Sequence, residues 1–327
     1  MRRCILGIDT SNYTTSVCAV DADTGQWVSE ARRVLPVKHG ERGLRQSDAL
    51  FFHVQQLPQM VRALMGGFSE AARVTWCGIG VSVQPRPQAA SYMPVFRAGE
   101  SVAETVGALL GAPVVRTSHQ EGHIAAATYF LPDMTGDRPF LAVHLSGGTS
   151  DVVLAEGTRF GYRVTPVAEG ADLHAGQFVD RVGVAMGLPF PAGPHLEQLA
   201  RRVSSSTLRL GGRLVNGRLS FSGPCSAALR AIEAGVDHAE VAYAVQQCIA
   251  NALVKAVDEA LRRVDVNVSD CVIAGGVAAN EAIRDRVCRR LGILRPDLRV
   301  RFAPARYSSD NALGVARIAW KFLFRGR

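Results

Sequence analysis

Short apolar runs separated by small polar turns open the chain. Cys4–Ile8, Thr15–Val20 and Trp27–Leu35 have the length and the residue types of β-strands, and polar residues at Asp9–Thr14 and Asp21–Gly25 separate them. The pattern predicts a three-stranded β-meander. The tip of its first hairpin presents hydroxyl groups, a carboxylate and backbone N–H groups.

The same layout recurs later in the chain. A predicted strand at Leu141–Leu145 is followed by the turn Ser146–Ser150, and two more strands, Asp151–Leu154 and Arg159–Val164, are joined by the turn Ala155–Thr158. Two copies of one supersecondary unit predict a duplicated α/β fold with two facing lobes. Tips rich in Gly and hydroxyl groups can wrap a phosphate, so two facing tips predict a nucleotide between the lobes. Either tip alone is equally typical of an ordinary tight hairpin.

Apolar residues at helical spacing predict helices between and after the two meanders. The expected helices are Gln46–Leu64, Ser101–Leu110, one from His119 to near Phe130, one ending at Met186, one starting at His195, one after Pro224, His238–Val264, one ending at Leu291, and Ala312–Phe324. Further strands are expected at Thr75–Val83, Pro113–Thr117, Cys271–Ala274 and Val300–Ala303. Ser101 and Glu104 have the spacing of a capping box, and the polar segment Ser204–Gly217 is expected to be an exposed excursion.

Two histidines, His119 and His123, stand four residues apart after the polar pair Thr117-Ser118. If Ser118 caps a helix, both imidazoles lie on one helix face, where they can bind one metal ion. Two surface or capping histidines would have the same spacing. The metallopeptidase motif His-Glu-x-x-His is not present, because Glu121 follows the first histidine by two residues instead of one.

Two further segments carry candidate chemistry. Gly275 and Gly276 follow a predicted strand, and Asn280 opens the next helix. A strand, a double glycine and a helix N-terminus can form a nucleotide site, although a simple strand–helix turn also needs small residues. Asp310 precedes the last helix, so it is either an N-cap or the carboxylate that completes a two-histidine metal site.

Composition adds only weak constraints. The 327 residues suffice for two medium domains, and 47% hydrophobic with 20% charged residues is typical of a soluble protein. No apolar run approaches the roughly 20 residues of a membrane span, and the first apolar run breaks at Asp9, so no signal peptide is expected. Seven scattered cysteines favour reduced thiols and a cytoplasmic location. The net charge of +8 and the eight arginines of Arg284–Arg306 fit either a polyanion such as tRNA or a solvated surface.

Several motifs, in this order along the chain, together resemble the TsaD family, which was once labelled O-sialoglycoprotein endopeptidase. They are Gly7-Ile8-Asp9-Thr10-Ser11, His119-x-Glu121-Gly122-His123, Leu145-Ser146-Gly147-Gly148, Ala175-Gly176 with Asp180, Pro191-x-Gly193-Pro194, Phe221-Ser222-Gly223, Ala274-Gly275-Gly276-Val277-x-Ala279-Asn280 and Asp310-Asn311. The resemblance implies the actin-like ATPase (ASKHA) fold, an α/β fold of two duplicated ribonuclease H-like lobes with an interlobe nucleotide cleft. It implies transfer of a threonylcarbamoyl group from threonylcarbamoyl-AMP to N6 of the tRNA adenosine adjacent to the anticodon.

The resemblance also implies roles for residues and partners. His119, His123 and Asp310 match the ligands of one divalent metal ion, iron or zinc. An adenine nucleotide (ATP, AMP or threonylcarbamoyl-AMP) is expected at Asp9, Ser11, Ser146, Gly147, Gly148, Asp180, Gly193, Gly275, Gly276 and Asn280. No covalent nucleophile is expected, because the adenine amine attacks the carbonyl directly. The expected partners are tRNA and TsaB- and TsaE-like proteins, with a dimer left open and no membrane.

We expect residues 1–135 to form the N-terminal lobe, residues 136–308 to form the C-terminal lobe with a helical insertion, and the helix 309–327 to pack back on the first lobe. Three segments depart from the family pattern: Gln84–Gln88, Thr149–Asp151, where a histidine near the metal is lost, and Asp172–Gln177, where two acidic groups are lost. These departures favour a divergent paralogue. The alternatives are carbamoylation of another acceptor, a regulatory nucleotide-binding module, a metallopeptidase or a small-molecule kinase of the same fold.

Overall fold

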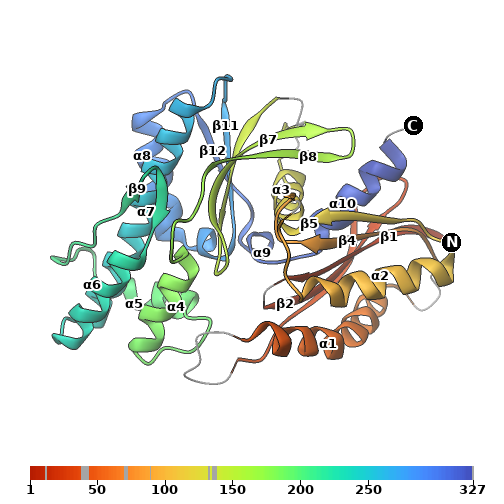
Figure 1. The fold of residues 1–327 in the computed structure, drawn as a ribbon, viewed down its shortest axis with the longest axis horizontal. Helices are drawn as coiled ribbons and strands as arrows, with labels where there is room; N and C mark the ends of the chain where they lie inside the picture. Colours follow the sequence, from red (N-terminus) through yellow and green to blue (C-terminus); the bar gives the residue numbers. More distant parts are fainter. Residues whose placement is uncertain are drawn as a thin grey trace.

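The structure is a computed structural model that describes residues 1–11, 13–37, 44–69, 73–88, 90–131, 133–134 and 138–325. Two five-stranded sheets form its framework, one on each side of the molecule's centre (Figure 1). The helices within residues 175–294 gather beyond the second sheet, and the helices α1 (Gln46–Gly66) and α2 (Phe96–Leu110) cover the first sheet from below in this view.

The first sheet has the strand order β3-β2-β1-β4-β5. β1 pairs antiparallel with β2 and β2 with β3, whereas β4 runs parallel to β1 and to β5. The strands are β1 (Arg2–Ser11), β2 (Thr14–Asp21), β3 (Trp27–Val34), β4 (Val74–Gln84) and β5 (Val114–Ser118). The expected meander is therefore present, extended by two parallel strands.

The second sheet repeats this order as β8-β7-β6-β11-β12. Its first three strands form an antiparallel meander and its last two pair in parallel, as in the first sheet. The strands are β6 (Phe140–Leu145), β7 (Ser150–Thr158), β8 (Gly161–Ala168), β11 (Asp270–Ala274) and β12 (Arg299–Phe302). The structure confirms the duplicated architecture predicted from the two meanders.

Helices cover both faces of the first sheet. On one face, Leu6 and Ile8 of β1 pack in one cluster with apolar residues of α1 (Gln46–Gly66) and α2 (Phe96–Leu110). On the other face, Ile5 packs with α10 (Leu313–Trp320). This alternation follows from the two-residue period of a strand.

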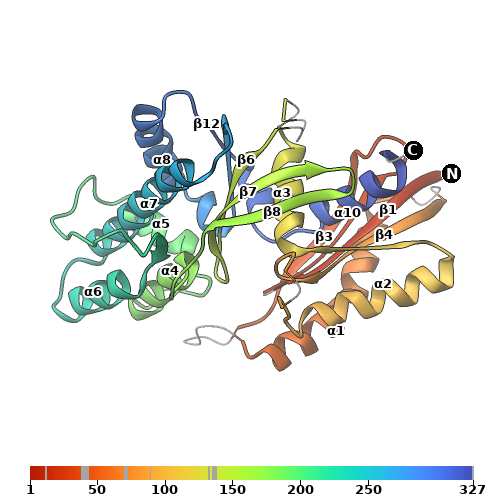
Figure 2. The same cartoon turned by 45° about the horizontal axis from the view of Figure 1, so that its top comes forward.

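The two lobes contact each other around α3 (His119–Tyr129). The hairpin of β7 and β8 extends over α3 toward α10 in Figure 2, and the Thr128 hydroxyl lies 2.8 Å from the Tyr162 hydroxyl of β8. The domain boundary expected at residues 135 and 136 lies outside the described residues, and the division into lobes at that point stays a prediction.

The second lobe is largely helical beyond its sheet. The long helix α7 lies in the main hydrophobic cluster together with residues of its neighbours. The helices are α4 (Ala175–Ala185), α5 (Gly193–Ala200), α6 (Ser222–Glu233), α7 (His238–Arg263) and α8 (Glu281–Leu294), with short segments at η1 (Gly276–Ala279), α9 (Ala305–Ser308) and η2 (Lys321–Arg325). No helix in the described ranges is both long and apolar enough to span a membrane.

Some local predictions are wrong. α2 begins at Phe96, so Ser101 lies inside the helix and is not its N-cap. The helix starts earlier because its first turn is buried: Phe96 is 1% exposed, and the backbone N–H of Gly99 donates to Thr10 Oγ1 at 3.1 Å. The segment expected to be an exposed excursion contains β9 (Arg213–Val215), which pairs with β10 (Arg218–Ser220), and the buried Leu210. All seven cysteines are free thiols as expected, although Cys288 is exposed.

Gly7 permits the close approach of α10 to β1, because a Cβ at this position would lie 2.5 Å from the backbone oxygen of Ala312. We expect Gly7→Ala to lower the free energy of unfolding by about 1–3 kcal/mol, since backbone atoms must move to accept the methyl group. Urea unfolding followed by circular dichroism measures this change. Gly66→Ala is the matched control, because nothing lies within 4 Å of its added Cβ. Equal stability of the two variants would contradict the tight contact.

Candidate metal and nucleotide site

The start of α3 is fixed by a capping box. Ser118 Oγ accepts a hydrogen bond from the backbone N–H of Glu121 at 3.2 Å, and the backbone N–H of Ser118 donates to Glu121 Oε2 at 3.0 Å. This confirms the prediction that Ser118 caps the helix. The carboxylate of Glu121 is engaged in holding the cap, so it does not face a substrate as a free base.

The two histidines of α3 and Asp310 come together. Nε2 of His123 lies 3.0 Å from Nε2 of His119 and 3.3 Å from Oδ1 of Asp310, and Nε2 of His119 lies 3.6 Å from the same oxygen. Atoms at such separations can all reach one ion at the usual ligand distance of about 2.1 Å. The structure thus assembles the three residues that the sequence proposed as metal ligands.

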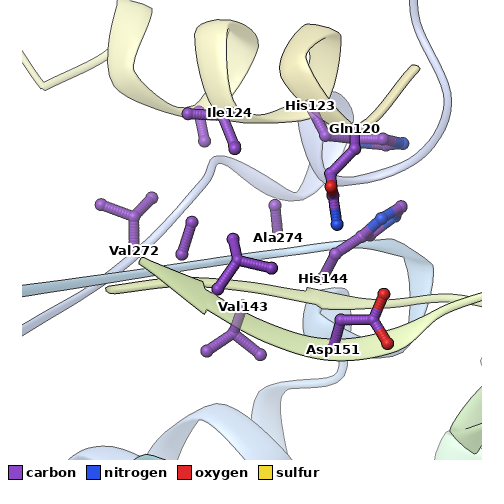
Figure 3. Close-up of a pocket in the computed structure, with 11 residues that line it drawn as sticks. Gln120, His123, Ile124, Val143, His144, Asp151, Val272 and Ala274 are labelled. Carbon is purple, nitrogen blue, oxygen red and sulfur yellow. The ribbon is translucent and has the colours of Figure 1, made fainter. Parts of the chain in front are cut away.

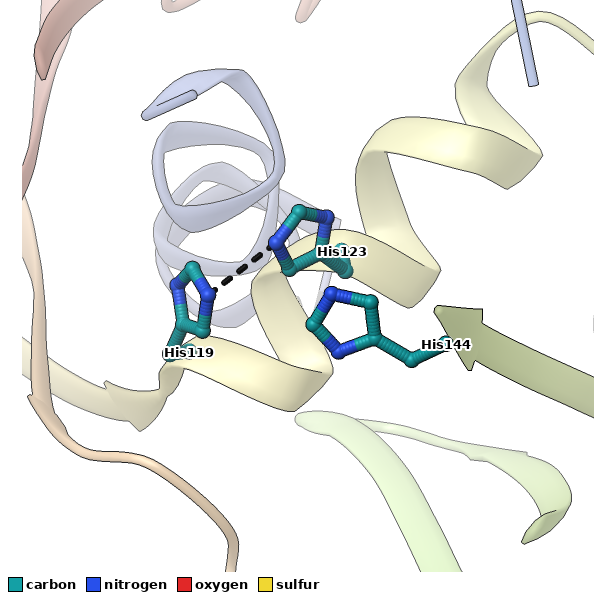
Figure 4. A group of neighbouring side chains, drawn as sticks. All are labelled: His119, His123 and His144. Atoms are coloured by element: carbon teal, nitrogen blue, oxygen red, sulfur yellow. Dashed lines mark hydrogen bonds between the residues drawn. The ribbon is translucent and has the colours of Figure 1, made fainter. Parts of the chain in front are cut away.

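His144 of β6 is a third imidazole at this place (Figure 4). Its ring centroid lies 4.0 Å from that of His123, and one ligand atom from each of the three histidines lies within 4.8 Å of the others. His144 Nε2 and His123 Nδ1 are buried and have no hydrogen-bond partner among the residues that the structure describes. Burial, followed by the neighbouring His123, lowers the pKa of His144 well below its usual range, which favours the neutral form that binds metals. These orphaned nitrogens and the set of imidazole and carboxylate donors fit a divalent metal ion.

Sequence reasoning missed His144 and expected a histidine near the metal to be lost after Gly148. The signal was present, because a histidine in the otherwise apolar run Leu141–Leu145 stands directly before the polar hairpin tip. The sequence does not show that the side chain of His144 on β6 packs against α3, because this contact depends on how the two lobes are arranged.

Asp9 lies behind the histidines and does not line the nucleotide cavity described below. Its buried carboxylate accepts from Ser11 Oγ at 2.5 Å and from Ser82 Oγ, and Oδ1 lies 3.2 Å from Nδ1 of His119. Burial opposes its ionisation, but His119 and the two hydroxyls lower its pKa to about 2. Burial lowers the pKa of His119, but the carboxylate of Asp9 raises it by more, so the net shift is upward. Asp9 therefore orients His119, as carboxylates behind metal-binding histidines do.

A cavity of about 400 Å³ lies beside the histidines and shares Asp310 with them. Six of the residues expected to bind a nucleotide line it, namely Ser146, Gly147, Asp180, Gly193, Gly276 and Asn280. The expected residues Asp9, Ser11, Gly148 and Gly275 do not line it. A cavity of this size is typical of small-molecule sites.

The walls of this cavity are built by close backbone contacts. The backbone N–H of Gly176, at the start of α4, donates to Ser146 O at 3.0 Å, and a Cβ on Gly176 would lie 2.6 Å from Gly147 N. Gly275 has φ of 106° and packs so tightly against Leu145 that a side chain would overlap its carbonyl group. The N-terminus of α4 and the glycine tip after β6 therefore meet at one corner of the cavity, where the first N–H groups of α4 donate within the protein.

Two polar side chains in the wall are held by backbone groups. Asp180 Oδ1 accepts from the backbone N–H of Ala192 at 2.8 Å, and burial raises the pKa of Asp180. Asn280 Oδ1 accepts from the backbone N–H of Ile283 at 3.0 Å, so Asn280 is the N-cap of α8. The double-glycine segment joins β11 to the helices that follow, and Gly276 lines the cavity.

The three segments that depart from the family pattern meet beside the histidines. Arg86 Nη2 lies 2.7 Å from Oδ2 of Asp151, whose side chain is 1% exposed, and Arg86 Nη1 lies 3.6 Å from Glu169 Oε1. The charge of Asp151 also acts on His174, the pKa of which is lowered by burial. Arg86 follows β4 and Asp151 belongs to β7, so this ion pair joins the two sheets' lobes.

A small second cavity of about 10 Å³, enough for about one water molecule, lies under α3. Figure 3 shows His123 and Gln120 on its α3 side and His144 and Asp151 on its β6–β7 side. Asp151 of the Arg86–Asp151 ion pair lines this cavity together with His123 and His144 of the histidine cluster.

The two lobes, the duplicated sheets and the cleft define a protein of the actin-like ATPase class. Among solved structures, full-length HypF in a phosphate- and nucleotide-bound form aligns with a TM-score of 0.59 at 13% identity, over 98% of this chain and 47% of HypF. A ROK family glucokinase from Streptomyces griseus, in complex with glucose and AMPPNP, aligns with a TM-score of 0.54 at 15% identity, over 97% and 99% of the two chains. At these identities the likeness shows the fold alone.

The chain belongs to the TsaD family, because the family model described as tRNA N6-adenosine threonylcarbamoyltransferase matches residues 53–320. A relative of that name from Persephonella marina is 28% identical over 325 residues, which is 97% of this chain and 89% of the relative. A probable bifunctional tRNA threonylcarbamoyladenosine biosynthesis protein from Methanothermobacter thermautotrophicus is 28% identical over 316 residues, and the chain spans 54% of its length.

We expect His123→Ala and His144→Ala each to reduce metal binding, because each removes an imidazole of the cluster. The loss should be larger for His123→Ala, because His123 also contacts Asp310. Metal content after equilibration with iron(II) or zinc(II) and gel filtration measures this. His174→Ala is the control, because His174 lies outside the cluster, and its metal content should stay unchanged. Full metal content in His144→Ala would remove His144 from the ligand set.

We expect Arg86→Gln to lower the free energy of unfolding by about 1–3 kcal/mol at neutral pH, because it leaves the buried carboxylate of Asp151 without its cation. Burial already raises the pKa of Asp151 and Arg86 opposes that rise. A carboxyl group whose pKa is higher in the folded than in the unfolded protein stabilises the fold less as the pH rises. The stability deficit of the variant should therefore be small below about pH 4 and grow toward neutral pH. Urea unfolding at several pH values tests this, with the exposed Arg163→Gln as control. A deficit that does not change with pH would argue against the pair.

Proposed function

We propose that this protein transfers a threonylcarbamoyl group from threonylcarbamoyl-AMP to N6 of the tRNA adenosine adjacent to the anticodon. Membership of the family supports the reaction. The single observation that carries the proposal is the position of Asp310, which contacts His123 and also lines the nucleotide cavity. A metal site and a nucleotide site that share one residue can act on the same acyl-adenylate.

The proposed metal ion, iron or zinc, is held by His119, His123 and Asp310, with His144 as a further imidazole. When bound, it supplies Lewis-acid polarisation of an oxygen of the acyl-adenylate. Asp9 holds the Nδ1 side of His119 so that Nε2 faces the site. This assigns the buried carboxylate a positioning role rather than direct contact with the substrate.

The proposed adenylate lies in the cavity of about 400 Å³. The hairpin tip at Ser146 and Gly147 suits its phosphate, and the carboxylate of Asp180 suits the ribose hydroxyls. The adenine amine of tRNA then forms a bond to the carbonyl carbon and loses a proton, while the bond from that carbon to the phosphate oxygen breaks and AMP leaves. No side chain needs to form a covalent intermediate.

We further propose that the reaction takes place in the cytoplasm with TsaB- and TsaE-like partner proteins. The oligomeric state, a dimer included, belongs to the same proposal. For the domains we propose lobes at 1–135 and 136–308, with the helix 309–327 as part of the first. The contacts of α10 with Ile5 and Ala22 of the first sheet's face support that last assignment.

A second candidate is transfer of a carbamoyl-type group from an adenylate to another acceptor. The ion pair of Arg86 and Asp151 favours it, because all three departing segments converge there, next to the histidine cluster. A change of acceptor would require a change at this place and would leave the nucleotide cavity intact. A metallopeptidase has no support here, because Glu121 is engaged in the helix cap.

We expect the protein to restore threonylcarbamoyladenosine in cells depleted of their own TsaD, and His123→Ala to abolish this effect because it removes a proposed metal ligand. Mass spectrometry of nucleosides from purified tRNA measures the modification. The His238→Ala variant, which changes an exposed histidine at the start of α7, serves as the folded control. Absence of the modification, with adenine nucleotide and metal still bound by the purified protein, would favour the second candidate.

A further inference from the structure

The arginines of the segment Arg284–Arg306 fall into two groups. Those near its end have carboxylate partners: Arg295 pairs with Asp258, Arg299 and Arg301 pair with Asp270 and Asp133, and Arg306 pairs with Glu30. Within the described part of the chain, Arg286, Arg289 and Arg290 of α8 form no ion pair with a carboxylate. Surface arginines on a merely solvated helix would be expected to include such pairs, as most of the other arginines of the segment do.

Two of the unpaired guanidinium groups are held together by one neutral side chain. Nε of Arg286 donates to Oδ1 of Asn251 at 2.9 Å, and Nη1 of Arg290 donates to the same oxygen at 2.7 Å. An amide oxygen positions both groups but neutralises neither. The two positive charges are therefore kept close to each other at the surface of α7 and α8.

A cavity of about 460 Å³ adjoins this pair. Arg209 enters its lining from the opposite side, on the loop before β9, and is steadied by a hydrogen bond of 2.9 Å from Nη1 to Ser206 O. The lining also includes the Ser205 hydroxyl and the Tyr243 ring of α7. Arg209 and Arg286 are thus two guanidinium groups that face one space.

The electrostatics of this cavity favour an anion. Burial, followed by the charge of Arg290, lowers the pKa of Arg286, and Arg289 and Arg209 act in the same direction, whereas Tyr243 opposes it. The nearby carboxylate of Glu240 accepts hydrogen bonds from Ser206 and Thr207 and forms no ion pair with these arginines. An anion in the cavity would relieve the repulsion and form charge-assisted hydrogen bonds.

We propose that this pocket binds a phosphodiester group of an RNA chain whose reacting base reaches the neighbouring nucleotide cavity. The basic pocket adjoins the nucleotide cavity, which supports an RNA chain that reaches both rather than a separate small anion. Ile283 lines the nucleotide cavity, and Arg286, about one helical turn farther along α8, lines the basic pocket. The same holds on α7 for the consecutive residues Gln246 and Gln247.

The size and lining of the pocket also suit a nucleotide of RNA. A volume of about 460 Å³ exceeds what one phosphate needs. Tyr243 offers a ring against which a base can stack, and the serine hydroxyls can contact a ribose. This inference rests on the proposed function in so far as tRNA is the acceptor.

The test compares two variants that each remove two positive charges. Arg209→Gln with Arg286→Gln alters two arginines that line the pocket, and Arg62→Gln with Arg163→Gln alters exposed arginines elsewhere. Fluorescence anisotropy of labelled tRNA at several salt concentrations gives the affinity and its salt dependence. We expect the pocket variant to lose about tenfold in affinity per phosphate contact near 0.1 M salt, with a salt slope smaller by about one per contact. The control variant should bind tRNA like the parent protein.

Each alternative outcome overturns the inference in a recognisable way. Equal losses in both variants would show a general effect of net charge. A change in the binding of inorganic phosphate or AMP without a change in tRNA binding would assign the pocket to a small anion. If the parent protein binds no tRNA, the inference fails. If it binds tRNA through this pocket but transfers no threonylcarbamoyl group, only the proposed function fails. Melting temperatures of both variants exclude unfolding as the cause of a loss.

Discussion

The contact between α3 and α10 determines where the candidate metal ligands stand. Gly122 of α3 and Gly314 of α10 face each other so closely that a side chain on Gly314 would overlap the backbone of Gly122. His123 follows Gly122, and Asp310 lies just before α10 begins. Because two glycines let the helices touch backbone to backbone, a carboxylate from the end of the chain reaches 3.3 Å from an imidazole near its middle. A larger residue at Gly314 would separate the helices and open the site.

The two lobes have the same sheet order but use their first hairpins differently. In the second lobe, the tip after β6 supplies Ser146 and Gly147 to the nucleotide cavity. In the first lobe, the polar residues at the end of β1 turn inward, where Asp9 contacts His119 and two hydroxyls. Of the two tips predicted to clamp a nucleotide, only the tip after β6 lines the cavity, among the residues that the structure describes. The reason is physical: a fully buried carboxylate needs donors, and Ser11, Ser82 and His119 supply them.

Much of the framework could be predicted because it follows from local pattern. The two-residue and 3.6-residue periods identified the strands and most helices, and Ser118 with Glu121 identified the start of α3. Features that depend on tertiary contacts were not predictable in the same way. The start of α2 depends on Gly99 contacting Thr10, and the participation of His144 depends on how β6 packs under α3. From the residues alone Asp310 was either an N-cap or a metal ligand, and only the family resemblance favoured the ligand, since 187 positions separate Asp310 from His123.

The departures from the family pattern take on a different meaning once their contacts are known. In the sequence, they remove a histidine and two acidic groups and favour a divergent paralogue. In the structure, Asp151 is almost fully buried and would be costly without a cation, and Arg86 supplies that cation from the other lobe. His144 likewise places an imidazole beside His119 and His123 although the histidine after Gly148 is absent. Arg86 and Asp151 therefore compensate each other's charge beside the histidine cluster, which is compatible with the proposed second candidate, in which the acceptor differs.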